Sequence, residues 1–246
     1  MKAVILAAGK GTRMGSLTDE LPKPMLPVEG RPILEHIISG IAAQGVREFH
    51  LITGWKAEVI EHHFGDGSLL GLSITYARQE VQDGTGKAPE LAKRFVGDDP
   101  FLLTYGDILV RPETYAAMTD RFGQGEFSGL ITVTPGEDVT KGAINFFDDE
   151  FCLRKIVEKP SAEQLDQLRA DGWLKEGDPM WYNAGIYIFR PVVFNHTAKL
   201  QRSPRGEYEL TDAIATMIAA SERIAGVKTE GRWIDIRDPE VLESLG

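Results

Sequence analysis

Short apolar runs alternate with longer amphipathic stretches through the first half of the chain. The runs predict buried strands, because turn-forming or polar residues bound them, at residues 3–7, 49–53, 72–78 and 101–105. The stretches between them repeat apolar residues at helical spacing, and we expect helices at residues 32–44, 57–64, 87–95 and 114–122. Strands that alternate with helices form a largely parallel sheet with helices on both faces. The first half of the chain therefore predicts an α/β fold.

The pattern changes after Gly125. Strand-like segments now follow one another more closely, at residues 127–133, 143–147, 152–158 and 181–189, with helices expected at 161–172, 192–200 and 210–220. Strands that follow one another without a long crossover can pair antiparallel. We therefore expect a single domain over residues 1–246, in which a partly antiparallel portion extends a mixed, mostly parallel sheet. No six-residue repeat occurs at the C-terminus, so we expect no appended left-handed β-helix.

Composition narrows the class of protein further. The 246 residues are 42% hydrophobic, which is enough for a substantial core, and the net charge is −10. An acidic chain is a poor partner for nucleic acid, whose backbone is held mainly by lysine and arginine. The single cysteine, Cys152, allows no intrachain disulfide and fits the cytoplasm. The first apolar run spans only residues 3–8, which is too short for a membrane span, and we expect no membrane partner.

A glycine-rich loop follows the first predicted strand, with the sequence Leu6-Ala-Ala-Gly-Lys-Gly-Thr-Arg13. Such loops bind phosphate, because backbone N–H groups converge on the anion and glycine allows close approach. The dinucleotide-binding fingerprint fails here, since Met14 stands where a third small residue is required. The nearest P-loop, around Gly86-Lys87, has Val81 for its first glycine and Ala88 for its serine or threonine. The loop therefore belongs to neither class.

Two cations accompany this loop. Arg13 can hold two phosphate oxygens with its planar guanidinium, and Lys23 lies between two prolines in Leu21-Pro-Lys-Pro24, which stiffens its backbone. Two cations beside a glycine-rich loop suit a triphosphate. The alternative is a tight turn with solvated cations.

The loop and the following Leu21-Pro-Lys-Pro24 together resemble the signature of sugar-1-phosphate nucleotidyltransferases, also called NDP-sugar pyrophosphorylases. The resemblance extends over nearly the whole chain. It implies a Rossmann-like nucleotidyltransferase fold and Mg²⁺-dependent transfer of a nucleotidyl group from a nucleoside triphosphate to a sugar 1-phosphate. Residues 1–125 then form the nucleotide-binding half and residues 126–246 the sugar-phosphate-binding half. A homo-oligomer stays open.

The resemblance also assigns individual residues. Arg13 and Lys23 are the catalytic cations. The nucleotide-binding residues are Leu6, Ala8, Gly9, Gly11, Thr12, Arg13, Gln79, Gly84 and Thr85. The sugar-phosphate-binding residues are Asp107, Gly142, Glu158, Lys159 and Asn183, and the magnesium ligands are Asp107 and Asp235. The residue types suit these roles, because an amide matches a pyrimidine edge, a carboxylate accepts from hydroxyls, and Mg²⁺ prefers carboxylates with phosphate oxygens.

The sequence does not decide which base the nucleoside triphosphate carries, or whether the chain catalyses a reaction at all. The segments Gly84-Thr-Gly86 and Arg205-Gly-Glu207 favour UTP or dTTP, whereas Thr104-Tyr-Gly-Asp107 and residues 54–60 also resemble cytidylyl- and guanylyltransferases. A binding module without turnover is the third alternative. The presence of both aspartates and both cations favours an enzyme. The role of Arg205 stays open.

Overall fold

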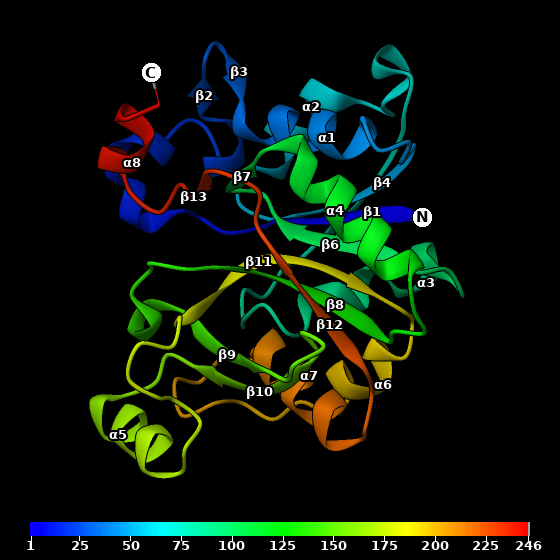
Figure 1. Cartoon of the computed structure of the whole chain (residues 1–246). Coiled ribbons are helices and arrows are strands. Elements are labelled where there is room, and N and C mark those ends of the chain that lie inside the picture. The colour runs from blue at the N-terminus through cyan, green and yellow to red at the C-terminus, as the bar shows by residue number, and fades with distance from the viewer. Residues whose placement is uncertain (246) are drawn as a thin grey trace.

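The computed structural model describes residues 1–245, and its centre is a sheet of nine strands. Four parallel strands form one half of this sheet, in the order β6 (Phe101–Tyr105), β1 (Lys2–Ala7), β4 (Glu48–Thr53) and β5 (Ser73–Arg78). Parallel neighbours need crossover connections, and helices supply them here. Figure 1 shows β1, β4 and β6 side by side in the upper part of the sheet.

The other half of the sheet is largely antiparallel and is organised around β11 (Trp181–Phe189). That strand pairs antiparallel with β6, with β8 (Gly129–Thr134) and with β9 (Ala143–Phe147). Beyond these, β10 (Leu153–Glu158) pairs antiparallel with β9, and β12 (Ile224–Lys228) lies parallel to β8. The predicted mixed sheet with an added antiparallel portion is confirmed.

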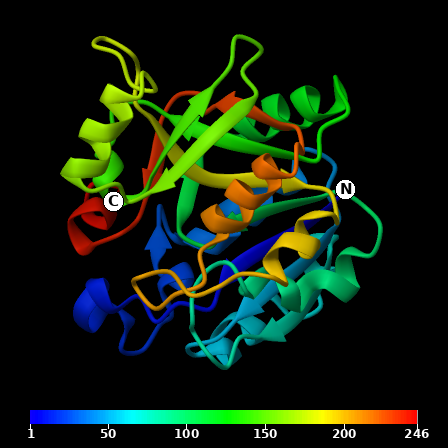
Figure 2. The same ribbon diagram turned by 90° about the horizontal axis from the view of Figure 1, so that it is seen from below.

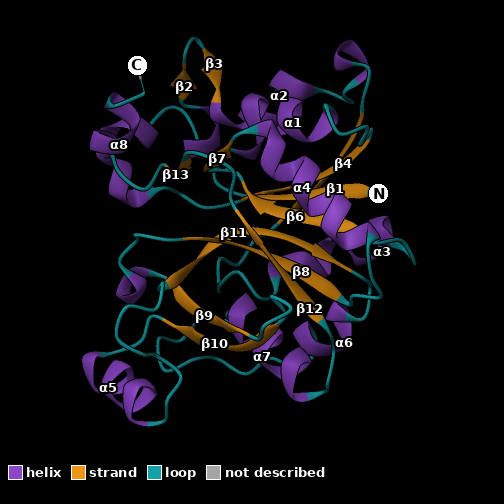
Figure 3. Ribbon diagram, viewed as in Figure 1, coloured by secondary structure: helices purple, strands orange, loops and turns teal. Residues whose placement is uncertain are grey.

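Helices cover both faces of the sheet. One face carries α1 (Ile33–Ala42), α2 (Ala57–Phe64) and α4 (Pro112–Gly123), and the other carries α3 (Lys93–Val96), α6 (Val193–Thr197) and α7 (Leu210–Ala219). Strand β1 alternates between these cores: Ala3, Ile5 and Ala7 pack with α1, and Val4 packs with α7. Figure 3 shows the two helical layers above and below the strands, and Figure 2, seen from below, shows α6 and α7 in front of the sheet.

The structure also differs from the sequence-based expectations. Residues 87–95 form a 3₁₀ helix at Ala88–Ala92 followed by the single turn of α3, rather than one α-helix. Proline at position 89 lies in the first turn of this segment, where an amide hydrogen would have no partner within the helix, so it does not account for the change. Short elements that the pattern did not predict are β2 (Pro27–Val28), β3 (Arg31–Pro32), β7 (Ile108–Val110), β12 and α8 (Pro239–Glu243). The polar helix expected at residues 161–172 is α5 (Ala162–Ala170), which covers a small third core.

Among the elements that the sequence pattern did not predict, strand β7 is the most important for the candidate site. It pairs antiparallel with β13 (Trp233–Asp235), a separate two-stranded ribbon. In the part of the chain from Met1 to Leu245, no helix is both long and apolar enough to cross a membrane.

Candidate functional site

The glycine-rich loop leaves the carboxyl end of β1 and turns at once into a 3₁₀ segment, Thr12–Thr18. Gly11 has a φ of 65°, and a Cβ there would lie 2.9 Å from the Cβ of Lys23. Glycine is therefore required at position 11 both by its left-handed backbone and by the lysine packed against it. Gly9 is different, because nothing lies within 4 Å of the Cβ it would carry. The loop thus packs against Lys23 at one glycine and is open at the other.

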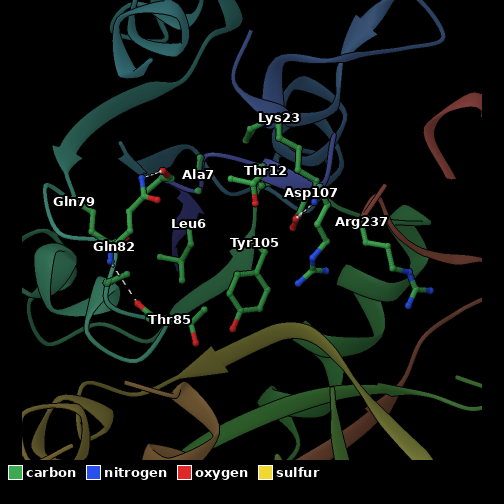
Figure 4. Close-up of a pocket in the computed structure, with 18 of the residues that line it drawn as sticks. Leu6, Ala7, Thr12, Lys23, Gln79, Gln82, Thr85, Tyr105, Asp107 and Arg237 are labelled. Carbon is green, nitrogen blue, oxygen red and sulfur yellow. Dashed lines mark hydrogen bonds and ion pairs between the residues drawn. The ribbon is translucent and has the colours of Figure 1, made fainter. Parts of the chain in front are cut away.

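A pocket of about 440 Å³ opens beside this loop. Every residue that the sequence assigned to the nucleotide lines it: Leu6, Ala8, Gly9, Gly11, Thr12, Arg13, Gln79, Gly84 and Thr85. Lys23, Asp107 and Asp235 line it as well. Figure 4 shows Leu6, Gln79 and Thr85 on one side of the pocket and Lys23 with Asp107 on the other. We call the end lined by Gln79 and Gln82 the amide-rich end, and the end lined by Lys23 and Asp107 the charged end.

The amide-rich end is held together by the loop after β5. The side chain of Gln79 donates from Nε2 to the carbonyl of Gly84 at 3.4 Å, and that of Gln82 donates to the carbonyl of Ala8 at 2.7 Å. Gly84 has a φ of 119°, and a Cβ there would lie 2.3 Å from the carbonyl oxygen of Tyr208. Glycine at position 84 is therefore needed so that this loop can lie directly against the chain before α7.

Lys87 lies two residues after Thr85, and its ammonium makes its contacts away from the amide-rich end. The ammonium of Lys87 donates to the carbonyls of Thr197 at 2.9 Å and Ala198 at 3.3 Å, at the end of α6. A cation is favourable there because the last carbonyls of a helix lack partners within it. Lys87 is thus engaged outside the pocket.

The charged end is built by β7 and β13. Asp107 directly precedes β7, and the register sets Asp235 opposite Ile108, while the amide of Ile236 donates to the carbonyl of Asp107 at 3.0 Å. Lys23 Nζ lies 2.5 Å from Asp107 Oδ2. Burial, together with repulsion from Asp107, raises the pKa of Asp235. Two carboxylates, one of them opposed by a lysine, thus stand together at the rim of the sheet.

A second pocket of about 270 Å³ adjoins the first. The residues that the sequence assigned to the sugar phosphate all line it: Asp107, Gly142, Glu158, Lys159 and Asn183. The residues common to both pockets are Arg13, Thr85, Tyr105, Asp107, Glu207 and Asp235. The two aspartates therefore stand at the junction of the pockets.

Glu158 lies at the end of β10 and has several partners. Its Oε2 accepts from the hydroxyl of Thr211 at 3.1 Å, and its Oε1 lies 3.8 Å from Lys159 Nζ and 3.5 Å from Arg205 Nη2. Burial raises the pKa of Glu158, and the charge of Lys159 opposes that rise. Arg205 also pairs with Glu209 at 2.9 Å. Arg205 thus holds acidic groups at the edge of the second pocket.

Two glycines shape the wall of the second pocket. Gly185 has a φ of 76° at an irregularity of β11, where its amide donates to Oδ1 of Asn183 at 3.1 Å. A Cβ on Gly142 would lie 2.3 Å from the hydroxyl oxygen of Tyr182, and the Gly142 carbonyl accepts from the amide of Lys159 at 2.6 Å. The backbone of the pocket is therefore set by close packing as well as by strand pairing.

Several lining residues were missed by the sequence analysis: Gln82, Tyr105, Glu207, Arg237, Tyr182, Tyr187 and Trp233. Tyr105 precedes the Gly106-Asp107 pair directly, and its burial raises its pKa to about 12. Its position directly before Gly106-Asp107 could have identified it as a site residue from the sequence. Gln82 and Arg237 stand outside any motif and carried none.

The two aspartates fit a divalent cation. Carboxylate oxygens suit Mg²⁺, which takes one or two of them and completes its shell with phosphate and water. Within residues 1–245, no group of three or more histidine, cysteine, aspartate or glutamate side chains is arranged to hold a metal. A cation here would thus take its other ligands from a bound phosphate or from water.

Comparisons with known proteins identify the family of the chain. Residues 2–244 match the nucleotidyl transferase family. The chain is 32% identical, over 99% of its length, to the low-salt glycan biosynthesis nucleotidyltransferase Agl11 of Haloferax volcanii, and covers 65% of that protein. It is 30% identical, over 98% of its length, to the UTP–glucose-1-phosphate uridylyltransferase AglF of the same organism, and covers 93% of it. Other curated relatives are covered to about half of their length, 52%.

The fold has a counterpart among solved structures. A UDP-glucose pyrophosphorylase complexed with UDP-glucose matches with a TM-score of 0.84 and 21% identity, over 99% of this chain and 96% of that one. At this identity the likeness shows the fold.

Proposed function

Because the chain belongs to the nucleotidyl transferase family, we propose that it transfers the nucleotidyl group of a nucleoside triphosphate to a sugar 1-phosphate and releases pyrophosphate. One observation carries this proposal. Two pockets meet at Asp107 and Asp235, as a reaction between two phosphorylated substrates requires. In this proposal residues 1–125 mainly bind the nucleotide and residues 126–246 mainly bind the sugar phosphate.

The nucleotide occupies the larger pocket. Its base lies at the amide-rich end, where the Gln79 side chain offers both a donor and an acceptor, and its phosphates follow the loop toward Arg13 and Lys23. Arginine suits the terminal phosphates because its fork can bind two oxygens at once. Leu6, Ala8 and Gly9 also line this pocket, and the absence of a side chain at Gly9 leaves room for the phosphates.

Asp107 and Asp235 hold the divalent cation, and we propose Mg²⁺ from the oxygen character of the pair. When bound, it supplies positive charge beside the reacting phosphates. Lys23 already pairs with Asp107 at 2.5 Å, so its ammonium lies close to the same place.

The sugar phosphate occupies the smaller pocket. Glu158 accepts hydrogen bonds from sugar hydroxyls, Asn183 adds an amide, and Lys159 holds the phosphate as a point charge. The backbone at Gly142 fixes Lys159 through its 2.6 Å hydrogen bond.

The reaction then needs no covalent intermediate. A phosphate oxygen of the sugar 1-phosphate attacks the α-phosphorus in line, a new P–O bond forms, and the bond from that phosphorus to the bridging oxygen breaks. The electron pair leaves with pyrophosphate, whose charge Arg13 and Lys23 stabilise. The residues contribute by positioning the substrates and by countering charge.

For the base we propose UTP or dTTP. The support is the amide of Gln79, which can offer a donor and an acceptor to a pyrimidine edge. The 30% identical relative whose name specifies UTP and glucose 1-phosphate agrees with this choice. CTP and GTP stay as alternatives to be tested.

The test is a screen of pyrophosphate release over five nucleotides and several sugar 1-phosphates with Mg²⁺. We expect release with a pyrimidine triphosphate, and its loss in Asp107→Asn. The matched control is Asp98→Asn, because Asp98 is exposed and does not line either pocket. If every pair is silent while nucleotide binding is measurable, the chain is a binding module and the proposed reaction is wrong.

A further inference from the structure

Arg237 lies in the nucleotide pocket without belonging to any motif of the sequence. It follows Asp235 by two residues, and its amide donates to the carbonyl of Asp235 at 2.9 Å. Its guanidinium lies 3.0 Å from a carboxylate oxygen of Glu137. Figure 4 shows Arg237 beside Asp107 at the charged end of the pocket. Arg237, which follows β13, thus lines the same pocket as Arg13 and Lys23.

The charged residues of the pocket indicate why a further cation would be needed to bind a triphosphate. Its charged lining residues are three cations and three carboxylates: Arg13, Lys23 and Arg237 with Asp107, Asp235 and Glu207. Lys23 is already paired with Asp107. A divalent cation would offset the two aspartates and leave the several charges of a triphosphate to be met by side chains. Without Arg237, Arg13 and Lys23 would be the cations of this lining left to meet those charges, and Lys23 is shared with Asp107.

The pairing with Glu137 leaves the guanidinium free to bind more. An arginine has five N–H donors, and Glu137 accepts one hydrogen bond, from Nη2. The side chains of Arg237 and Glu137 are 27% and 29% exposed, so water reaches the pair and its net strength is small. A phosphate with two or more charges is a stronger partner for a guanidinium than one half-exposed carboxylate.

Glu137 stands outside both pockets, on the chain segment that leads to Gly142. It lies in the turn after β8, just before the 3₁₀ helix Val139–Lys141 that leads to Gly142. Glu137 does not line the nucleotide pocket. It can thus hold the guanidinium without touching the nucleotide.

Resting on the proposed function, we propose that Arg237 is a further phosphate-binding residue for the nucleotide and the pyrophosphate product, and that Glu137 competes with phosphate for its guanidinium. The ion pair with Glu137 orients the Arg237 side chain while no phosphate is bound in the pocket. On binding, phosphate oxygens replace the carboxylate.

The competition separates this role from a structural one. If the pair only braced the fold, Arg237→Gln and Glu137→Gln would both remove the brace and would weaken binding alike. If Arg237 binds phosphate, the two variants act in opposite directions. Arg237→Gln removes a charged hydrogen bond and should weaken binding about tenfold or more. Glu137→Gln frees the guanidinium and should tighten binding about two- to fivefold.

The experiment is calorimetric titration of the full chain with inorganic pyrophosphate in the presence of Mg²⁺. Arg169→Gln is the matched control, because Arg169 pairs with Asp166 on the exposed helix α5 and lines neither pocket. Arg237→Lys should retain part of the binding, since it keeps the charge without the fork. Opposite shifts in the two glutamine variants support the inference; shifts in the same direction, or an unchanged Arg237→Gln, overturn it.

The result does not depend on turnover. Suppose that the wild-type chain binds pyrophosphate and the variants shift in opposite directions, but no substrate pair releases pyrophosphate. The phosphate site would then be supported and the proposed reaction would be wrong. A wild-type chain that binds no pyrophosphate would overturn the inference itself.

Discussion

Replacing Gly142 by alanine adds one methyl group to the proposed sugar-phosphate pocket. The φ of Gly142 is −148°, outside the left-handed region, but its ψ of −142° lies beyond the broad β region, so alanine also carries a backbone cost there. The added Cβ would lie 2.3 Å from the hydroxyl oxygen and 2.4 Å from Cζ of Tyr182. Ordinary contact begins at 3.4 Å, so the ring or the chain at Gly142 must move by about 1 Å. The substitution therefore adds a steric conflict with Tyr182 to the backbone cost at Gly142.

The expected losses of stability and activity follow from the contacts of Gly142 with Tyr182 and Lys159. Overpacking of this kind costs about 1–3 kcal/mol of stability, and 1 kcal/mol corresponds to roughly 2–4 °C in Tm for a chain of this size. The Gly142 carbonyl also holds the amide of Lys159 at 2.6 Å, so a shift of the chain moves the residue proposed to bind the sugar phosphate. A displacement of about 1 Å near a reacting group can cost on the order of 100-fold in rate. We expect kcat/KM for the sugar phosphate to fall by about that factor.

Steady-state pyrophosphate release, with each substrate varied in turn, measures this loss. KM for the nucleotide should stay near the wild-type value, because Gly142 lines only the smaller pocket. Gly123→Ala at the end of α4 is the control, since nothing lies within 4 Å of its added Cβ. Thermal unfolding of Gly142→Ala combined with Tyr182→Leu should show less loss than the sum of the two single changes. Additive losses, or wild-type kinetics in Gly142→Ala, would refute the steric account.

Three further changes probe other parts of the molecule. Asp107→Asn should lower kcat on the order of 100- to 1,000-fold, measured by pyrophosphate release at saturating substrates and Mg²⁺; wild-type turnover would contradict the metal assignment. Gly84→Ala should cost about 1–3 kcal/mol and weaken nucleotide binding, because of its φ of 119° and its contact with Tyr208; denaturant unfolding and nucleotide titration check both. Burial lowers the pKa of His50 from its ordinary 6.5, so protonation favours the unfolded chain, and the stability due to neutral His50 is lost as pH falls from 6.5 through the lowered pKa. His50→Leu should flatten the loss of stability below pH 6.5, and an unchanged slope would exclude His50 as its source.

Local sequence was sufficient where local signals agree. The helix expected at residues 57–64 is found as Ala57–Phe64, and it ends at Gly65, whose φ is 53°. The strand expected at residues 101–105 is found with the same bounds, since its apolar run is buried in the middle of the sheet. In both segments periodicity, boundary residues and tertiary packing favour one structure.

The sequence was insufficient where distant packing decides. Strand β12 contains Gly226 in its middle, which weakens any strand pattern. In the structure a Cβ at that glycine would lie 2.5 Å from the ring of Phe147 and 2.7 Å from that of Phe151. Two aromatic rings packed against the strand thus explain a residue that by itself argues against a strand.

The same limit applies to the site. The glycine-rich loop could be recognised because it is a motif of contiguous residues, whereas Gln82 and Arg237 line the nucleotide pocket as single residues from separate loops. Their side chains reach the pocket only through the paths of the chain after β5 and after β13. No spacing rule within a short window could find them.

The junction between the pockets depends on one pairing, that of β7 with β13. Asp235 stands opposite Ile108, the residue after Asp107, and successive side chains of a strand point to opposite faces. A slip of one residue would turn Asp235 away from the pocket and present the apolar Ile234 or Ile236 instead. Ile236 is fully buried, and the Trp233 indole donates to the carbonyl of Ala184 at 2.9 Å, so both ends of β13 oppose such a slip. The position of the second carboxylate is therefore fixed by apolar packing and one indole hydrogen bond, outside the charged site that it completes.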